Sequence, residues 1–227
     1  MVRRHVHSDF APDVFVFPGG KVDPADRDPE LARWVGAHEP SDNGAELALR
    51  VAAIRELFEE AGVLLARRAD GTVVDLSGEE QETFAEYRRR IHSEEISLGE
   101  MARAEGLELA VDLLHPFSHW ITPEGFPRRY DTRFFAAQLP LGQSPLHDAL
   151  ETTDSVWINP GEGLQRFREG TFPLVFATER NLERMARFAS LDEMVAATTS
   201  EDLQPIVPRM VREGAETRFL IPGDEGY

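Results

Sequence analysis

The most informative stretch of this 227-residue chain reads AAIRELFEEAGV, residues 52–63. On a helix the carboxylates of Glu56, Glu59 and Glu60 stand at i, i+3 and i+4, so they share one face. Three like charges so close together repel one another, which indicates a counter-ion, and hard divalent cations such as Mg²⁺ prefer oxygen ligands. The opposite face is apolar and is expected to pack on a core. We therefore predict a helix over residues 45–61 that binds a divalent cation; a solvated acidic helix is the alternative.

The residues that flank this helix carry start and stop signals. Gly62 can end it by adopting the left-handed conformation, and Asn43 with Glu46 can begin it as a capping-box-like pair. Further upstream, FVFPGGKVD at residues 15–23 predicts a short buried strand broken by a Pro-Gly-Gly turn. Because glycine lets a backbone carbonyl approach a metal or a phosphate closely, this turn favours the cation-binding interpretation of the helix over a solvated acidic helix.

Together the two segments resemble the Nudix hydrolase signature, G-x5-E-x7-R-E-U-x-E-E-x-G-U, in which U is a bulky aliphatic residue. Its second half is present in full at residues 55–63, and its first half is present at residues 18–23. The two halves are farther apart than the signature allows, so the box carries an insertion at roughly residues 27–44.

The insertion leaves the position of the first signature glutamate open. Counted forward from Gly20, this position falls on Asp26, and counted back from Arg55, it falls on Leu47, one place from Glu46. An interrupted box of this form resembles the peroxisomal acyl-CoA diphosphatase branch of the superfamily. The likeness extends to downstream segments: WITP at 120–123, RRYDTRFF at 128–135, RNLE at 180–183, FASL at 188–191 and IPGDE at 221–225.

The resemblance implies an α+β Nudix fold, with a mixed β-sheet sandwiched between helices in three layers (α/β/α). An early strand that is expected before the Pro-Gly-Gly turn is short here, which indicates a truncated first strand. The sheet is then completed by another element or by a second subunit, and because an unpaired edge is a liability, a homodimer is one expectation.

We predict a single Nudix domain over residues 1–227, with a second insertion that is charged and helical in pattern at about 78–110. Within that insertion, Ser97-x-x-Glu100 is a helix start. The other expected elements are strands at 113–121 and 130–139, helices from Asn159 and over 178–189, and a closing hairpin at 206–211 and 218–221.

Composition excludes several classes of function. The chain has no cysteine, so thiolate catalysis and zinc–thiolate sites are excluded. Its formal net charge of −17 argues against nucleic-acid binding, and a phosphate substrate would be repelled unless local cations neutralise the site. No apolar run is long enough for a membrane span. The first residues lack the apolar region of a signal peptide, so we expect a cytoplasmic protein.

The resemblance also implies a set of site residues. Glu56, Glu59 and Glu60, with the Gly20 carbonyl, would hold Mg²⁺ or Mn²⁺, and Arg55 would orient the carboxylates through charge-assisted hydrogen bonds. A general base is needed to activate the attacking water. Two candidates stay open, Glu56 itself and Glu151, because a carboxylate in the loop before Trp157 often serves in this family.

Basic residues elsewhere in the chain are candidates for binding the substrate. Arg128 and Arg129 precede a strand and could face phosphate, although a solvated pair is the alternative, and Lys21, the only lysine, follows the glycine turn. His115 and His119 are four residues apart, but the strand-like pattern around them and Pro116 argue against a metal site.

We expect a metal-dependent hydrolase that cleaves the pyrophosphate bond of a small-molecule nucleoside diphosphate derivative. The branch resemblance implies CoA or acyl-CoA as the substrate. The alternatives are ADP-ribose, NADH or a dinucleotide within the same chemistry, and a non-catalytic Nudix-fold protein that only binds a nucleotide. The intact carboxylates favour catalysis.

Overall fold

The computed structural model describes residues 1–5, 12–36, 44–145, 152–199, 202–213 and 216–227. The acidic stretch forms helix α1 (Ala45–Ala61), as predicted, and Gly62 ends it in the left-handed conformation with φ 67°. Its N-cap is Gly44, which provides no side-chain cap. The predicted capping pair stays a prediction because Asn43 lies outside the described residues. Glu46 accepts a hydrogen bond from Nε of Arg50 at 3.1 Å.

The remaining helices follow the predicted pattern, with one addition. In the first insertion are two 3₁₀ helices, η1 (Ala25–Arg27) and η2 (Pro29–Arg33), and a third, η4 (Val111–Leu113), precedes the long hairpin. The α-helices after α1 are α2 (Glu80–His92), α3 (Leu98–Glu105), α4 (Pro160–Arg168), α5 (Phe176–Met185) and α6 (Leu191–Thr199). Helix α3 begins at the capping box of Ser97 and Glu100, as predicted, whereas α6 was not predicted.

The strands form short ladders. They are β1 (Val2–Arg4), β2 (Phe15–Val16), β3 (Ala66–Arg67), β4 (Glu108–Leu109), β5 (His115–Ile121), β6 (Asp131–Ala136), β7 (Thr152–Ser155), β8 (Arg209–Glu213) and β9 (Glu216–Leu220). Within the described residues the order is β2-β1-β7, β3-β4, β5-β6 and β8-β9, all antiparallel. Parallel bridges from Phe15 to Leu174 and from Trp120 to Ile206 make the pairing mixed. The short β1 has a partner on each side.

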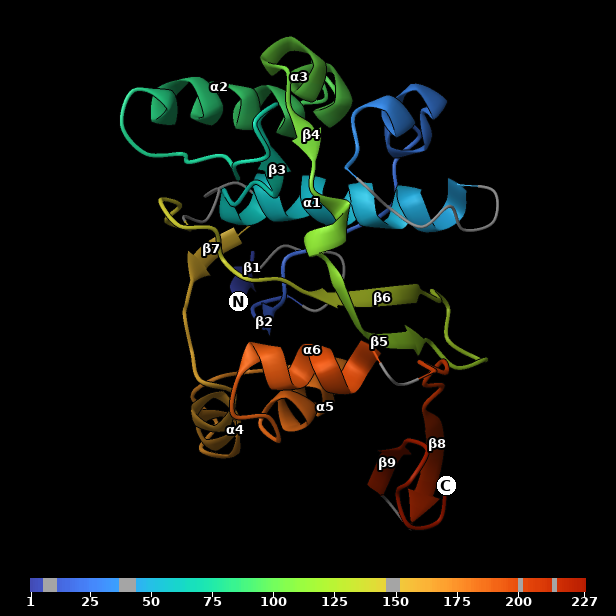
Figure 1. Ribbon diagram of the computed structural model, residues 1–227. Helices are drawn as coiled ribbons and strands as arrows, with labels where there is room; N and C mark the ends of the chain where they lie inside the picture. The colour runs from blue at the N-terminus through green and yellow to red at the C-terminus, as the bar shows by residue number, and fades with distance from the viewer. Residues whose placement is uncertain (6–11, 37–43, 146–151, 200–201, 214–215) are drawn as a thin grey trace.

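The layers follow from which faces are apolar. Figure 1 shows α1 across the molecule, with α2 and α3 on one side, strands β5 and β6 on the other, and α5 and α6 beyond them. The core lies between α1, α2 and α3. Its fully buried members include Ile54, Phe58, Leu64, Leu65, Leu98, Met101, Leu107 and Leu109. Each such side chain stabilises the fold by about 1.5–3 kcal/mol. Because residues of α1, α2 and α3 belong to one cluster, the helical insertion is part of the same core as the signature helix.

Helix η1 packs directly on α1, which brings the segment after the Pro-Gly-Gly turn against the acidic helix.

Among the described residues, no helix is both long and apolar enough to cross a membrane.

Candidate active site

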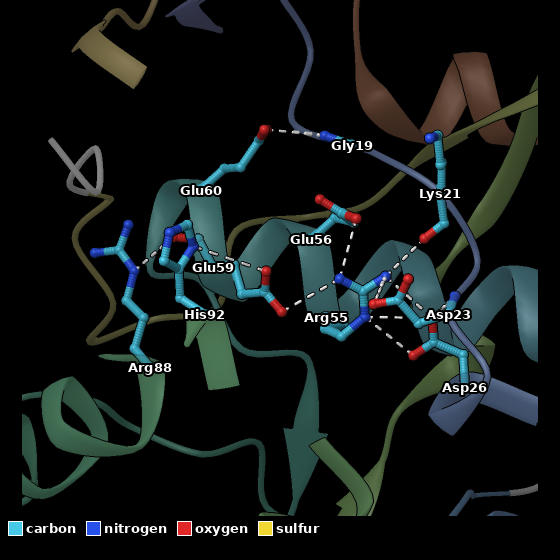
Figure 2. Close-up of polar contacts among 10 residues, drawn as sticks. All are labelled: Gly19, Lys21, Asp23, Asp26, Arg55, Glu56, Glu59, Glu60, Arg88 and His92. Atoms are coloured by element: carbon cyan, nitrogen blue, oxygen red, sulfur yellow. Dashed lines mark hydrogen bonds and ion pairs between the residues drawn. The ribbon is translucent and has the colours of Figure 1, made fainter. Parts of the chain in front are cut away.

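Arg55 lies at the centre of the polar cluster on α1. The residue is only 7% exposed, and its guanidinium binds Asp26, with 3.1 Å from Nε to Oδ1 and 3.0 Å from Nη2 to Oδ2. Nη2 also donates to the carbonyl of Lys21 at 2.7 Å (Figure 2). Asp26 is itself buried, at 3% exposure, and it accepts a hydrogen bond from the amide of Asp23 at 2.8 Å. This cluster ties the segment after the glycine turn to α1.

The two acidic residues near the first acidic position of the signature differ in their contacts. Asp26, counted forward from Gly20, contacts Arg55. Glu46, one place from the backward count, lies nine residues before Arg55 on the same helix, roughly 14 Å along its axis at 1.5 Å per residue, and it pairs with Arg50. The contact with Arg55 favours Asp26, whose place in the signature stays a prediction.

Arg55 is held as a permanent cation. Burial alone lowers the pKa of its guanidinium, but the hydrogen bonds of Asp26 and the negative charges of Glu56, Asp26 and Glu59 outweigh burial and raise that pKa. Nη1 lies 3.0 Å from Oε1 of Glu56 and 3.2 Å from Oε1 of Glu59. One fixed cation thus contacts two of the three signature carboxylates.

The glycine turn contacts two carboxylates of the same helix. The amide of Gly19 donates to Oε2 of Glu60 at 2.9 Å (Figure 2). A Cβ atom at Gly20 would lie 2.2 Å from Oε1 of Glu56, closer than any real side chain can approach. A side chain at this position would displace the end of Glu56, so glycine is what lets the backbone lie so close to the carboxylate.

Glu59 differs from its neighbours in its surroundings. Burial raises the pKa of its carboxyl, and the charges and hydrogen bonds of Arg55 and the charge of His92 only partly oppose this. The side chain is 12% exposed. An ionised carboxylate at this site therefore carries an uncompensated desolvation cost, which a bound cation would relieve.

The donor set fits a hard divalent cation by its chemistry. Glu56, Glu59 and Glu60 supply carboxylate oxygens, and Gly20 lets the backbone lie against them. In the described part of the chain, however, no group of three or more His, Asp or Glu side chains is gathered closely enough to hold an ion. Two of these carboxylates contact separate partners, Gly19 for Glu60 and Arg55 for Glu59. The metal-ligand set thus stays a prediction.

Lys21 and an arginine pair from a distant part of the sequence meet beside this turn. Lys21, Arg128, Arg129 and Tyr130 line an open pocket of about 420 Å³. The Lys21 side chain points away from Arg55 while its carbonyl points toward it (Figure 2). Arg129 is anchored by its Nε, which donates to the carbonyl of Thr122 at 3.0 Å. Tyr130 was not singled out from the sequence, although it directly follows the arginine pair.

Other candidates from the sequence lie elsewhere. His119 stands on strand β5, and its Nε2 lies 2.6 Å from Oδ1 of Asp131, so this nitrogen contacts a carboxylate. It lines a smaller pocket of about 200 Å³ together with Glu46 and Arg133. Glu151 lies outside the described residues, and its role as a base stays a prediction.

Two residues of the helical insertion, which the sequence did not point to, also reach the site. The Nε of Arg88 donates to the backbone carbonyl of Glu59 at 2.8 Å, and Nδ1 of His92 lies 4.0 Å from Oε2 of the same residue (Figure 2). The last turn of α1 contains no basic residue. This is the one sequence signal that could have suggested that a basic side chain from another element contacts the negative end of the helix dipole.

Similarity to known proteins extends over most of the chain. Residues 37–185 match the family model of the NUDT19 Nudix domain. The whole chain is 28% identical to 71% of the acyl-coenzyme A diphosphatase NUDT19 of Gallus gallus, and equally to that of Homo sapiens. A crystal structure of a NUDIX hydrolase from Alicyclobacillus acidocaldarius is 28% identical, with a TM-score of 0.70 over 90% of this chain and 88% of that one.

This chain therefore belongs to the NUDT19 Nudix domain family, and it is a Nudix pyrophosphohydrolase. The α+β Nudix fold predicted from the sequence is confirmed by the structural neighbour. Nudix hydrolases generally use divalent metal ions, which agrees with the oxygen-rich donor set on α1.

Proposed function

We propose that this chain hydrolyses the pyrophosphate bond of CoA or an acyl-CoA. The observation that carries the proposal is the pocket in which Lys21, Arg128 and Arg129 converge, one residue from the Gly20 contact with Glu56. Cleavage there would give adenosine 3′,5′-bisphosphate and a 4′-phosphopantetheine product. The name of the relatives, acyl-coenzyme A diphosphatase, supports the same substrate.

The charge of the pocket favours CoA over the alternatives. CoA carries a phosphomonoester on its ribose in addition to the diphosphate, and such a group has close to two negative charges at neutral pH. A chain with a net charge of −17 repels this anion at long range, so the phosphate needs several local cations. Two arginines and one lysine meet that need, since arginine binds phosphate through two parallel N–H groups. ADP-ribose and NADH lack this phosphate and are the second candidates.

The residues on α1 would perform the chemistry. Glu56, Glu59 and Glu60, with the Gly20 carbonyl, would hold Mg²⁺ or Mn²⁺, which supplies positive charge against the bridging phosphates and acidifies a bound water. Arg55 is enclosed by carboxylates and orients them without touching the substrate. The proton of the attacking water would pass to Glu56 or to Glu151.

The test is product analysis by mass spectrometry with Mg²⁺ or Mn²⁺. The substrates are CoA, acetyl-CoA, a long-chain acyl-CoA, 3′-dephospho-CoA, ADP-ribose and NADH, and Glu59→Gln is the control variant. We expect adenosine 3′,5′-bisphosphate from the CoA compounds, a slower reaction with 3′-dephospho-CoA, and loss of product in the variant. Cleavage of only ADP-ribose or NADH would keep the chemistry and refute the substrate. Tight binding without cleavage would favour the non-catalytic nucleotide-binding alternative.

We further propose one domain over residues 1–227, because the helical insertion shares its core with α1 through Phe84 and Ile91. The homodimer and the cytoplasmic location stay predictions from the sequence. Light scattering over a range of protein concentrations tests the first of these.

A further inference from the structure

The last turn of α1 is completed by a residue from another helix. The final carbonyls of an α-helix have no partner within the helix. In α1 the carbonyl of Phe58 accepts from the amide of Gly62 at 2.9 Å, and the carbonyl of Glu59 accepts from Nε of Arg88 at 2.8 Å. The last turn of α1 has no basic residue of its own, so Arg88 also brings a positive charge to the negative end of the helix dipole.

Helix α2, which carries Arg88, also faces the carboxylate of Glu59. Nδ1 of His92, one turn after Arg88, lies 4.0 Å from Oε2, while Oε1 lies 3.2 Å from Nη1 of Arg55. Figure 2 shows Glu59 between Arg55 on one side and the pair from α2 on the other. Its backbone and its side chain are thus both contacted by the helical insertion.

The helix that carries Arg88 is firmly anchored. Phe84 and Ile91 are 3% and 4% exposed and belong to the core that α1 shares. Residues 84, 88 and 91 stand at i, i+4 and i+7, on one face of α2. The position of Arg88 relative to Glu59 is therefore set by core packing.

We propose that Arg88 and His92 are positioning residues for the metal site, through which the insertion fixes the last turn of α1 and the orientation of Glu59. This inference rests on the proposed function, in which Glu59 binds the cation. Residues that contact a metal ligand without binding the metal themselves set the orientation of that ligand, and their loss weakens metal binding by about 10–100-fold. Without Arg88 the Glu59 carbonyl loses its hydrogen bond, and the last turn is free to fray.

The test compares Arg88→Ala with Arg89→Ala, a matched control on the same helix. Arg89 is 71% exposed and pairs with Glu86. Mn²⁺ binding is measured by titration calorimetry without substrate, and the Mn²⁺ dependence of CoA cleavage is measured in parallel. For Arg88→Ala we expect Mn²⁺ affinity to fall about tenfold or more, with KM for CoA unchanged at saturating Mn²⁺. Arg89→Ala should match wild type, and Arg88→Lys should restore part of the affinity.

The inference is overturned if folded Arg88→Ala binds Mn²⁺ within twofold of wild type, or if Arg89→Ala is weakened equally. Should Arg88→Ala fail to fold, His92→Ala carries the test, with a several-fold loss of Mn²⁺ affinity expected and an unchanged affinity refuting the proposal. A wild-type protein that binds Mn²⁺ but does not cleave CoA would refute the proposed substrate alone, because the calorimetric comparison is independent of substrate.

Discussion

Replacing Asp26 with alanine is expected to destabilise this protein strongly, because it removes the acidic partner of a buried arginine. The change deletes the hydrogen bonds to Nε and Nη2 of Arg55, at 3.1 and 3.0 Å. It also leaves the amide of Asp23 without the acceptor that it now has at 2.8 Å. The side chains of Asp26 and Arg55 are only 2% and 8% exposed, so water cannot readily replace the lost partner.

The loss of stability in Asp26→Ala depends on the ion pairs that Arg55 retains. Breaking a buried ion pair by removing one partner costs about 3–5 kcal/mol. Arg55 would still contact Glu56 and Glu59 at 3.0 and 3.2 Å, which places the loss at the lower end, about 3 kcal/mol. For a chain of this length, that loss corresponds to a decrease in Tm of roughly 6–12 °C. Asp26→Asn keeps the shape and one acceptor, so it should lie between alanine and wild type.

The assay is urea unfolding followed by circular dichroism, with Asp23→Ala as the matched control. Asp23 also approaches Arg55, at 3.5 Å, but its side chain is 46% exposed, and such pairs contribute at most about 1 kcal/mol. If both alanine variants lose the same free energy of unfolding, the reasoning that the buried pair of Asp26 and Arg55 stabilises the fold more than the exposed contact of Asp23 fails.

Three further predictions concern the turn, the pocket and a distant ion pair. Gly20→Ala should leave the fold intact, since its Cβ meets only the flexible end of Glu56, but lower kcat about a hundredfold by displacing that carboxylate; unchanged kcat would contradict this. Arg128→Ala should raise KM for CoA about tenfold, a loss of about 1.4 kcal/mol, with little effect on ADP-ribose, and equal effects on both would refute a phosphate subsite. The hydrogen bonds from Arg67 lower the pKa of Asp112 below its ordinary 3.8, so this pair stabilises the fold above that pH and the contribution is lost as pH falls through the lowered pKa. The difference in unfolding free energy between wild type and Asp112→Asn, discounted for exposure to about 1 kcal/mol or less, should therefore vanish in acid, and a difference that grows below pH 3.8 would reverse the sign of this argument.

The sequence predicted the parts of the fold that depend on local patterns. The bounds of α1 and the left-handed Gly62 at its end were predicted from apolar spacing and one glycine, and the capping box at Ser97 was recognisable for the same reason. Helix α6 was missed.

The candidate site was less predictable because its contacts cross the chain. Counting along the signature could not choose between Asp26 and Glu46, since an insertion shifts one count against the other and only packing decides. Arg88 contacts Glu59 across 29 residues. Helical spacing places Arg88, unlike Arg89, on the face of Phe84 and Ile91, but it does not say which element that face meets. The convergence of Lys21 with Arg128 likewise depends on the tertiary fold.

The ion pair between Asp26 and Arg55 has a consequence for the length of the insertion. The segment after Asp26 leaves from this buried pair and returns at the start of α1, so both of its ends are fixed in space. The entropy of closing such a loop grows only with the logarithm of its length, and each doubling costs about 0.6 kcal/mol. The interrupted box can therefore gain residues between these two points at little cost, provided that Leu31 of this segment keeps its place in the core, while the carboxylates of α1 keep their places.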